Sequence, residues 1–465
     1  MKIGLLDHMG YGNLGDAATQ EALIANIRSR LPDAEIVGFS LNPVDTTKRH
    51  GIESWSITYW HPGLGKSGLS DSSQTGSSGA DSHGADSKRP HLRARLKSIA
   101  KNIPVVSRVA RRLLHAGREA AHLGRSYRRL RSLDALIIAG GGQLSELWGG
   151  PWSHPYNVFK FSLLTTVARR KLVFANVGAG PLKSGLSRAF VRWSIRMADY
   201  VSFRDAESQE LACGSGVKRQ THVFPDSAYA LDVSKYAQDV SRYASGSRTS
   251  SAKPLVGLNP IGFCDPRIWP KKDAAVYESY IGKLADFSVW LLNNNYDLRL
   301  YSAEASVDIY AIEDLGKCLR SRLSGADLDR ICRPSAGTVS GLMAEMSGFD
   351  FVVTAKFHGV VFSHLLAKPV IALSYHPKID DLMRKVGHSQ YCLDIATFDN
   401  KGLENTFVAL VNDSEQLKAR FRRTAASYSE TLKTQFDGLF APGTQRLRSR
   451  TPESERNEAV AGGPA

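Results

Sequence analysis

The chain has 465 residues, 42% of them hydrophobic, and a formal net charge of +15. This length exceeds what one hydrophobic core usually serves, so we expect two domains with appendages. The five cysteines are odd in number, scattered and without a CxxC pair, which argues against a disulfide framework and against a zinc knuckle. The apolar runs are too short to span a membrane, and Asp7 comes too early for a signal peptide, so we expect a cytoplasmic protein.

The positive charge is concentrated in one stretch. Residues 88–131 contain fourteen Lys or Arg and one acid, Glu119, and so account for thirteen of the fifteen net charges. The rest of the chain is nearly neutral, which disfavours a nucleic-acid-binding protein, where basic residues line a face with aromatic residues between them. A polybasic helix can instead hold a protein against anionic lipid at the inner face of a membrane. The alternative is a solvated helix or a partly disordered insert.

The first half of the chain alternates buried strands with helices. The pattern predicts strands at 2–6, 34–39, 133–139, 172–176 and 200–203, and helices at 16–30, 157–169 and 187–198. The stretch 63–86 is rich in Ser, Gly and Asp and cannot bury a core, so we expect a disordered and basic insertion over 63–132. The sequence therefore predicts an N-terminal Rossmann-like domain over residues 1–233.

A polar, Ser/Arg-rich linker over 234–253 separates this half from a second α/β unit over 254–415. The second unit is predicted to contain strands at 255–258, 297–301, 351–353 and 370–373, with a helix at 277–293. A last helix follows over 416–440, and we expect the tail 441–465 to be disordered. Two alternating units predict two doubly wound parallel sheets, that is, two Rossmann-like domains facing a cleft.

The segment from Phe349 to Lys378 places charged groups at the carboxyl end of a buried strand. Lys356 and His358 follow the strand and open a helix. Open α/β sheets bind ligands at that edge, and the amino ends of helices favour anions. The sequence therefore predicts an anion site here. The plainer alternatives are a helix-capping histidine and a solvated lysine.

The turn Gly10-Tyr-Gly-Asn-Leu-Gly15 has the G-x-G-x-x-G spacing of a dinucleotide site. That fingerprint also requires an acidic residue at the end of the second strand, but this strand ends in Phe39-Ser-Leu-Asn42. We therefore favour close approach of backbone amides to a substrate, with polar contacts from Asn13 and Asp16. A purely structural turn is the alternative.

These motifs, in this order and spacing, resemble the polysaccharide pyruvyl transferase family over residues 1–60 and 133–400. The matching pieces are Gly12-Asn-Leu-Gly-Asp16, Gly140-Gly-Gly142, Gly178-Ala-Gly-Pro181, Phe203-Arg-Asp205 with Ser208, Asp226, and the segment ending Ser374-Tyr-His-Pro-Lys378. The resemblance implies a fold like the two-domain glycosyltransferase-B architecture. It also implies transfer of a pyruvyl group from phosphoenolpyruvate to hydroxyls of a surface glycan or its lipid-linked precursor, which gives a pyruvate ketal.

The same resemblance implies an acceptor-binding N-terminal domain and a donor-binding C-terminal domain, with no cofactor. Phosphoenolpyruvate carries a phosphate and a carboxylate, so its site needs two cations, and protonation of its methylene carbon needs an acid working near neutral pH. We expect His358, Arg204 and Lys356 to be catalytic, with His358 as the acid. We expect the donor to be bound by Arg204, Lys356, His358 and Lys378. For the acceptor we expect Asn13, Asp16, Gly141 and Gly142. The sequence has no cluster of acidic residues and histidines with the spacing of metal ligands, so we expect no metal.

Two positions depart from the family pattern. Lys356 stands where the family usually has Arg, and His376 where it usually has Asp. Lysine keeps the charge but loses the planar fork that grips an anion with two parallel bonds. Two other functions therefore stay open: a nucleotide-sugar glycosyltransferase, with Glu304 holding ribose hydroxyls, and a non-catalytic binding protein. The aromatic loop 148–156 is expected either to stack a sugar ring or to cover a core.

Overall fold

A computed structural model describes residues 1–7, 12–59, 104–147, 149–239, 253–328, 331–332 and 337–441. These residues belong to two compact units, Met1–Ile57 with Leu130–Ala465, and Thr58–Arg129. The low-complexity stretch 63–86, most of the predicted linker and nearly all of the tail lie outside the described residues, so the expectations for them stay predictions.

The first sheet is parallel throughout and has the strand order β3-β2-β1-β4-β6-β7-β8, with β5 paired to β6. Its strands are β1 Lys2–Leu6, β2 Glu35–Ser40, β3 Ser54–Ser56, β4 Ala135–Ile138, β5 Gly141–Leu144, β6 Lys171–Ala179, β7 Tyr200–Phe203 and β8 His222–Val223. The helices of this part are α1 Leu14–Arg30, α2 Pro43–His50, α5 His154–Val167, α6 Gly185–Met197 and α7 Ala206–Cys213, with the 3-10 turns η1 Gly214–Gly216, η2 Ser227–Ala230 and η3 Val233–Asp239. The central strand β4, Ala-Leu-Ile-Ile, is buried at every residue, as a strand covered on both faces must be.

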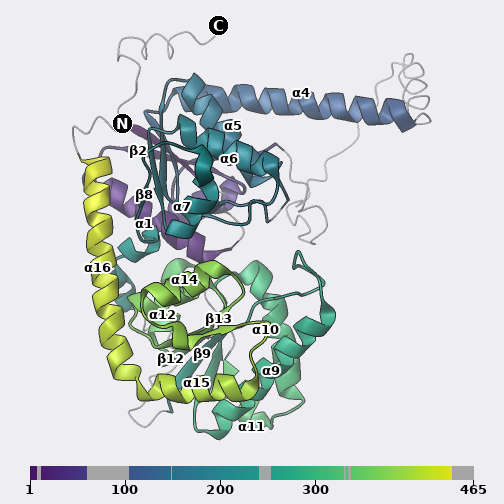
Figure 1. The fold of residues 1–465 in the computed structure, drawn as a ribbon, viewed down its shortest axis with the longest axis vertical. Helices are drawn as coiled ribbons and strands as arrows, with labels where there is room; N and C mark the ends of the chain where they lie inside the picture. The colour runs from purple at the N-terminus through teal and green to yellow at the C-terminus, as the bar shows by residue number, and fades with distance from the viewer. Residues whose placement is uncertain are drawn as a thin grey trace, which may run out of the picture. The chain divides into compact units, whose positions relative to one another are not determined.

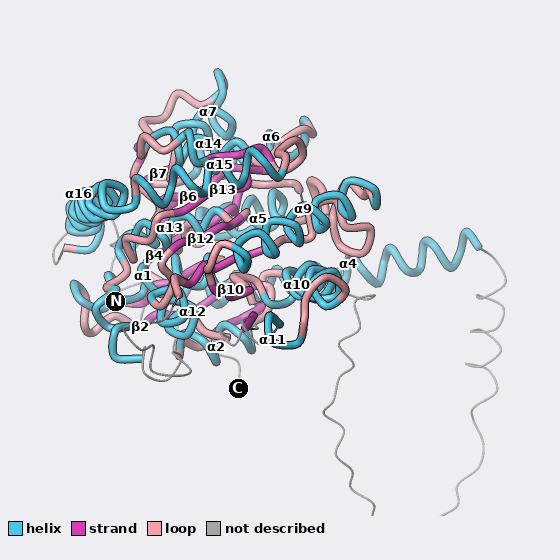
Figure 2. The backbone as a smooth tube through the Cα atoms, turned by 90° about the horizontal axis from the view of Figure 1, so that it is seen from below, coloured by secondary structure: helices cyan, strands magenta, loops and turns pink. Residues whose placement is uncertain are grey.

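The second sheet is also parallel and has the order β11-β10-β9-β12-β13-β14. Its strands are β9 Leu255–Asn259, β10 Asp297–Leu300, β11 Ile331–Cys332, β12 Phe351–Thr354, β13 Val370–Ser374 and β14 Cys392–Asp394. The helices that alternate with them are α9 Ala274–Asn293, α10 Ala305–Arg320, α11 Gly325–Leu328, α12 Val339–Ser347, α13 Phe357–Leu365, α14 Pro377–Lys385 and α15 Asn400–Asn412, with the 3-10 turn η4 Ser389–Tyr391. Figure 2 shows the strands running between layers of helices, which confirms the predicted α/β class with two parallel sheets.

The long helix α16, Ser414–Phe440, runs alongside both sheets (Figure 1). Near its end, the Gln435 side chain exchanges hydrogen bonds with the buried Asn176 amide of the first sheet, at 2.9 and 2.7 Å. Near its beginning, the Phe421 ring lies 4.4 Å from the His364 ring of α13. One hydrophobic cluster includes Phe421 and side chains from both sheets, so α16 joins the two halves through burial as well as hydrogen bonds.

In the unit Thr58–Arg129 the described residues belong mainly to α4, Pro104–Arg131. This helix contains the carboxyl-terminal part of the basic segment 88–131, and within the unit Tyr59 Oη lies 3.2 Å from His115 Nδ1. None of the helices in the described part of the chain is both long enough and apolar enough to cross a membrane.

Candidate active site

The carboxyl ends of the strands bring the predicted catalytic residues to the junction between the two sheets. Arg204 follows β7 directly, and His358 is the second residue of α13, after β12. A β carbon at Gly359 would lie 2.4 Å from Thr354 Oγ1, so glycine is required where α13 starts against the end of β12. This edge of a parallel sheet is where α/β proteins bind ligands.

His358 meets a buried hydroxyl and a buried carboxylate. Its Nε2 lies 3.4 Å from Thr19 Oγ1 of α1 and 3.7 Å from Asp226 Oδ2. His358 as a whole is 8% exposed to solvent. On the other side of the ring, a β carbon at Gly15 would be 2.1 Å from Nδ1. The missing side chain at Gly15 therefore makes room for the imidazole, which is held between α1 and Asp226.

Asp226 also joins His358 to the predicted anion-binding arginine. Its Oδ2 lies 3.4 Å from a terminal nitrogen of Arg204, and its Oδ1 accepts a hydrogen bond from the Ala228 amide at 3.0 Å. Burial would raise the pKa of this carboxyl, but the hydrogen bond and charge of His358 and the charge of Arg204 outweigh it and lower the pKa. Asp226 is therefore ionised at neutral pH and lies beside the His358 ring.

Arg204 is held by carboxylates and by an aromatic ring. Its Nε lies 3.4 Å from Asp205 Oδ2, and its guanidinium carbon lies 4.5 Å from the centre of the Phe357 ring. A β carbon at Gly178 would lie 2.5 Å from Nε, so glycine is needed beside the guanidinium. These contacts fix the plane of Arg204 before any ligand arrives.

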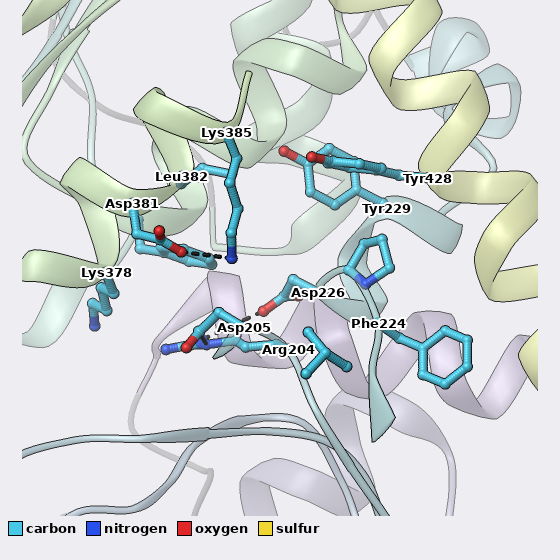
Figure 3. A pocket seen from close by; sticks show the side chains of 13 residues that line it. Arg204, Asp205, Phe224, Asp226, Tyr229, Lys378, Asp381, Leu382, Lys385 and Tyr428 are labelled. Atoms are coloured by element: carbon cyan, nitrogen blue, oxygen red, sulfur yellow. Dashed lines mark hydrogen bonds and ion pairs between the residues drawn. The ribbon is translucent and has the colours of Figure 1, made fainter. Parts of the chain in front are cut away.

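Arg204 lines a pocket of about 200 Å³ between the two sheets (Figure 3). The pocket is lined by Arg204, Asp205, Val223, Phe224, Pro225, Asp226, Tyr229, Phe357, Lys378, Asp381, Leu382, Lys385 and Tyr428. The pocket thus brings Arg204 and Lys378 together. The His358 imidazole lies outside the pocket and contacts two of its lining residues, Asp226 and Phe357.

The three cations of the pocket differ in how far their charge is neutralised. Arg204 is compensated by two aspartates, and Lys385 Nζ lies 2.6 Å from Asp381 Oδ2. Lys378 has no ion pair within the described ranges, and its Nζ lies 5.9 Å from the centre of the Phe357 ring. Burial and the charge of Arg204 lower the pKa of Lys378 to about 8. An anion that enters the pocket would relieve this repulsion.

Lys356 lies in a different environment. Its Nζ is 2.6 Å from Glu304 Oε2 and 3.0 Å from Asp308 Oδ1, and Lys356 does not line the pocket. Burial would lower its pKa, but Asp308 and Glu304 raise it, so Lys356 stays charged. Glu304 forms a β-bridge with Asn13, so this ion-pair cluster supports the contact between the two halves.

The four predicted acceptor residues lie together at the amino end of α1 and on β5. Asn13 caps α1, since its side-chain oxygen accepts the amides of Gly15 and Asp16 at 3.1 and 3.2 Å. Gly141 has φ of +85°, and a β carbon there would lie 2.9 Å from Asp16 Oδ1. Gly141 and Gly142 are the first two residues of the short strand β5.

Sequence reasoning gave no role to Thr19, Lys385 or Tyr229, and it used Asp226 only as part of a motif. Asp226 comes three residues after β8, at the same sheet edge as Arg204. The rule that ligands bind at the carboxyl ends of parallel strands could therefore have identified it. Thr19 lies one helical turn after Gly15 and faces the same ring. Tyr229 and Lys385 line the pocket without an equally clear sequence signal.

Comparison with known proteins gives both a family and a fold. The family model described as polysaccharide pyruvyl transferase matches residues 13–377. The UDP-GlcNAc 2-epimerase from Methanocaldococcus jannaschii aligns at 8% identity over 89% of this chain and 93% of its own, with a TM-score of 0.53. A putative UDP-N-acetylglucosamine 2-epimerase from Listeria monocytogenes aligns at 11% identity over 97% and 99%, also with a TM-score of 0.53. The S. aureus MnaA–UDP structure aligns at 11% identity over 93% and 94%, with a TM-score of 0.52. At these identities the structures show the fold alone, and they agree with the predicted two-domain, glycosyltransferase-B-like architecture.

Proposed function

Since the chain belongs to the polysaccharide pyruvyl transferase family, we propose that it transfers a pyruvyl group from phosphoenolpyruvate to two hydroxyls of a glycan sugar. The observation that carries this proposal is the pocket in which Arg204 and Lys378 face the same space. A donor with one phosphate and one carboxylate needs two cations, and the wall of this pocket supplies them. The acceptor is a surface glycan or its lipid-linked precursor.

Donor binding is assigned to these two cations. Arg204 is pre-oriented by Asp205 and Asp226, so it can present its planar fork to phosphate or carboxylate without reorganisation. Lys378 lacks a carboxylate partner within the described ranges and becomes the point charge for the second anionic group. Lys356 is assigned a supporting role, because it does not line the pocket and its ammonium is held by Glu304 and Asp308.

His358 is the proposed acid. A proton from its imidazolium passes to the methylene carbon of phosphoenolpyruvate, which leaves positive charge on the neighbouring oxygen-bearing carbon. Because His358 does not line the pocket, this step requires the methylene end of the donor to reach the ring past Asp226 and Phe357. One sugar hydroxyl adds to that carbon, and a second hydroxyl then forms the other C–O bond as the C–O bond to phosphate breaks. Of the two hydroxyl protons, one returns to His358 and the other leaves with phosphate.

Asp226 and Thr19 act on His358. The carboxylate stabilises the imidazolium, and the Thr19 hydroxyl lies within hydrogen-bond reach of the same nitrogen. Because Asp226 also contacts Arg204, arrival of donor charge at the guanidinium is coupled to the acid through one carboxylate. The amino end of α1 and the start of β5 are the proposed acceptor side.

The test compares His358→Ala, Arg204→Ala and wild type by phosphate release, with phosphoenolpyruvate and a panel of glycan acceptors. We expect His358→Ala to abolish turnover while thermal stabilisation by phosphoenolpyruvate largely persists. Arg204→Ala should mainly lose that stabilisation. His222→Ala, a partly exposed histidine that does not line the pocket, is the matched control. Equal activity of wild type and His358→Ala would reject the acid, and stabilisation by nucleotide sugars alone would reject the donor.

A further inference from the structure

Helices α5 and α6 together expose a broad apolar surface. They pack against each other on the first sheet, and their outward side chains include Trp152, just before α5, Leu163, Val167, Leu186 and Trp193. These five residues, called the α5–α6 face below, are 65%, 42%, 58%, 36% and 45% exposed. Single exposed apolar residues need no explanation, but a gathering of them marks a contact surface.

Aromatic rings below this face make it continuous across the two helices. The Phe159 ring stacks on Phe190 at 5.0 Å and lies 5.5 Å from Trp193, and Trp152 lies 5.7 Å from Phe190. The two exposed indoles are thus supported from beneath by packed rings, and they do not lie on loose loops. An indole held in this way presents a large rigid surface at little cost in conformational entropy.

The helices that form the face are rich in cations. Between Glu146 and Asp199 the chain has eight Lys or Arg and no acidic residue; Lys160 and Arg170 are buried, and Lys171 is paired with Asp199. The two flanking acids are engaged locally, because Glu146 accepts the Ser184 amide at 2.9 Å and Asp199 lies 3.2 Å from Lys171 Nζ. Lys183 and Arg196 are exposed and have no ion pair among the residues described. The exposed apolar residues are therefore accompanied by two exposed cations, Lys183 just before α6 and Arg196 within it.

We propose that the α5–α6 face docks on an anionic lipid surface, separately from any contact of the basic segment 88–131. Trp side chains prefer the interface between headgroups and acyl chains, and Lys or Arg beside them meet lipid phosphates. A second copy of the chain fits less well, because a two-fold contact would place the cations of one face against the same cations of the other. Docking would hold the enzyme beside a lipid-linked acceptor.

The test uses the full-length protein with phosphatidylcholine vesicles that contain or lack phosphatidylglycerol. Bromine-labelled lipid should quench tryptophan fluorescence on binding to anionic vesicles, and the double variant Trp152→Ser/Trp193→Ser should lose this quenching. Because a Lys or Arg near the surface contributes about fivefold in affinity, Lys183→Glu/Arg196→Glu should weaken binding about 25-fold or more. The double variant Ile309→Ser/Val408→Ser, at exposed apolar residues of other helices, is the control and should behave as wild type.

Three results would overturn the proposal. Sedimentation with vesicles without quenching would assign lipid contact to another part of the chain. No binding to either vesicle would exclude a lipid surface as the occupant. Concentration-dependent self-association that disappears in the double tryptophan variant would make a second copy the occupant. Because Trp152 and Trp193 are 65% and 45% exposed, their variant should lose some packing but still unfold in one cooperative transition, and a melting curve checks its fold.

Discussion

Donor binding should weaken as pH rises through about 8, because Lys378 must be charged to bind an anion. Burial and Arg204 lower the pKa of Lys378 from 10.5 to about 8. With that value, roughly nine in ten molecules carry the charge at pH 7 and roughly one in ten at pH 9. A phosphate monoester completes its second ionisation near pH 6, so the donor itself changes little in this range. The KM for phosphoenolpyruvate should therefore rise about tenfold between pH 7 and pH 9.

The same reasoning predicts proton uptake. If the bound anion raises the pKa of Lys378 well above 8, binding at pH 8 takes up about half a proton per site. Calorimetry in two buffers of different ionisation enthalpy measures this quantity directly. Lys378→Arg is the matched variant, since guanidinium stays charged throughout and should remove both the uptake and the rise in KM. A flat KM in the wild type, or an equal rise in the arginine variant, would refute the role of Lys378.

Three further predictions concern stability and the position of the acid. Lys378→Met should stabilise the empty protein by about 1–3 kcal/mol in urea unfolding at pH 7, because a lowered lysine pKa costs stability below pH 8 and this cost vanishes as pH rises to 10.5. Gly15→Ala should displace the His358 ring and lower kcat by about a hundredfold or more, whereas Gly282→Ala, with open space at its β carbon, should not. Burial lowers the pKa of His388 to about 4, so the folded protein should lose stability as pH falls from 6.5 toward 4, and His388→Phe should lessen this loss in melts across that range.

The strands with continuous apolar runs were predictable from sequence. The segments Lys2–Leu6 and Tyr200–Phe203 have the same limits in the structure as in the prediction. Strand β5 was not predicted, because its Gly-Gly-Gln-Leu sequence lacks the β-branched and aromatic residues that mark a strand. Helix α1 begins two residues earlier than expected, since Asn13 and Asp16 are both good capping residues and the structure uses Asn13.

The place of the candidate residues in the fold was predictable, but their contacts were not. The rule that ligands bind at the carboxyl ends of parallel strands singled out Arg204, Lys356 and His358, and the structure has these residues directly after β7 and β12. It could not show that Lys356 would be neutralised by Glu304, because their contact requires β10 and β12 to lie on either side of β9. The contact between Asp226 and His358 likewise joins a residue after β8 of the first sheet to a residue after β12 of the second. The periodicity of apolar residues along the chain carries no information about such contacts.

The position of Lys356 changes how its departure from the family pattern is understood. From sequence, lysine in place of arginine suggested weaker grip on the donor. In the structure its ammonium lies between Glu304 and the fully buried Asp308, and Asp308 also accepts a bond from Asn259 at 3.2 Å. A compact charge can bridge two carboxylates at this site, while the donor pocket obtains its cations from Arg204 and Lys378. The replacement therefore bears on how firmly the two halves hold together, and it leaves the charge that a donor would meet unchanged.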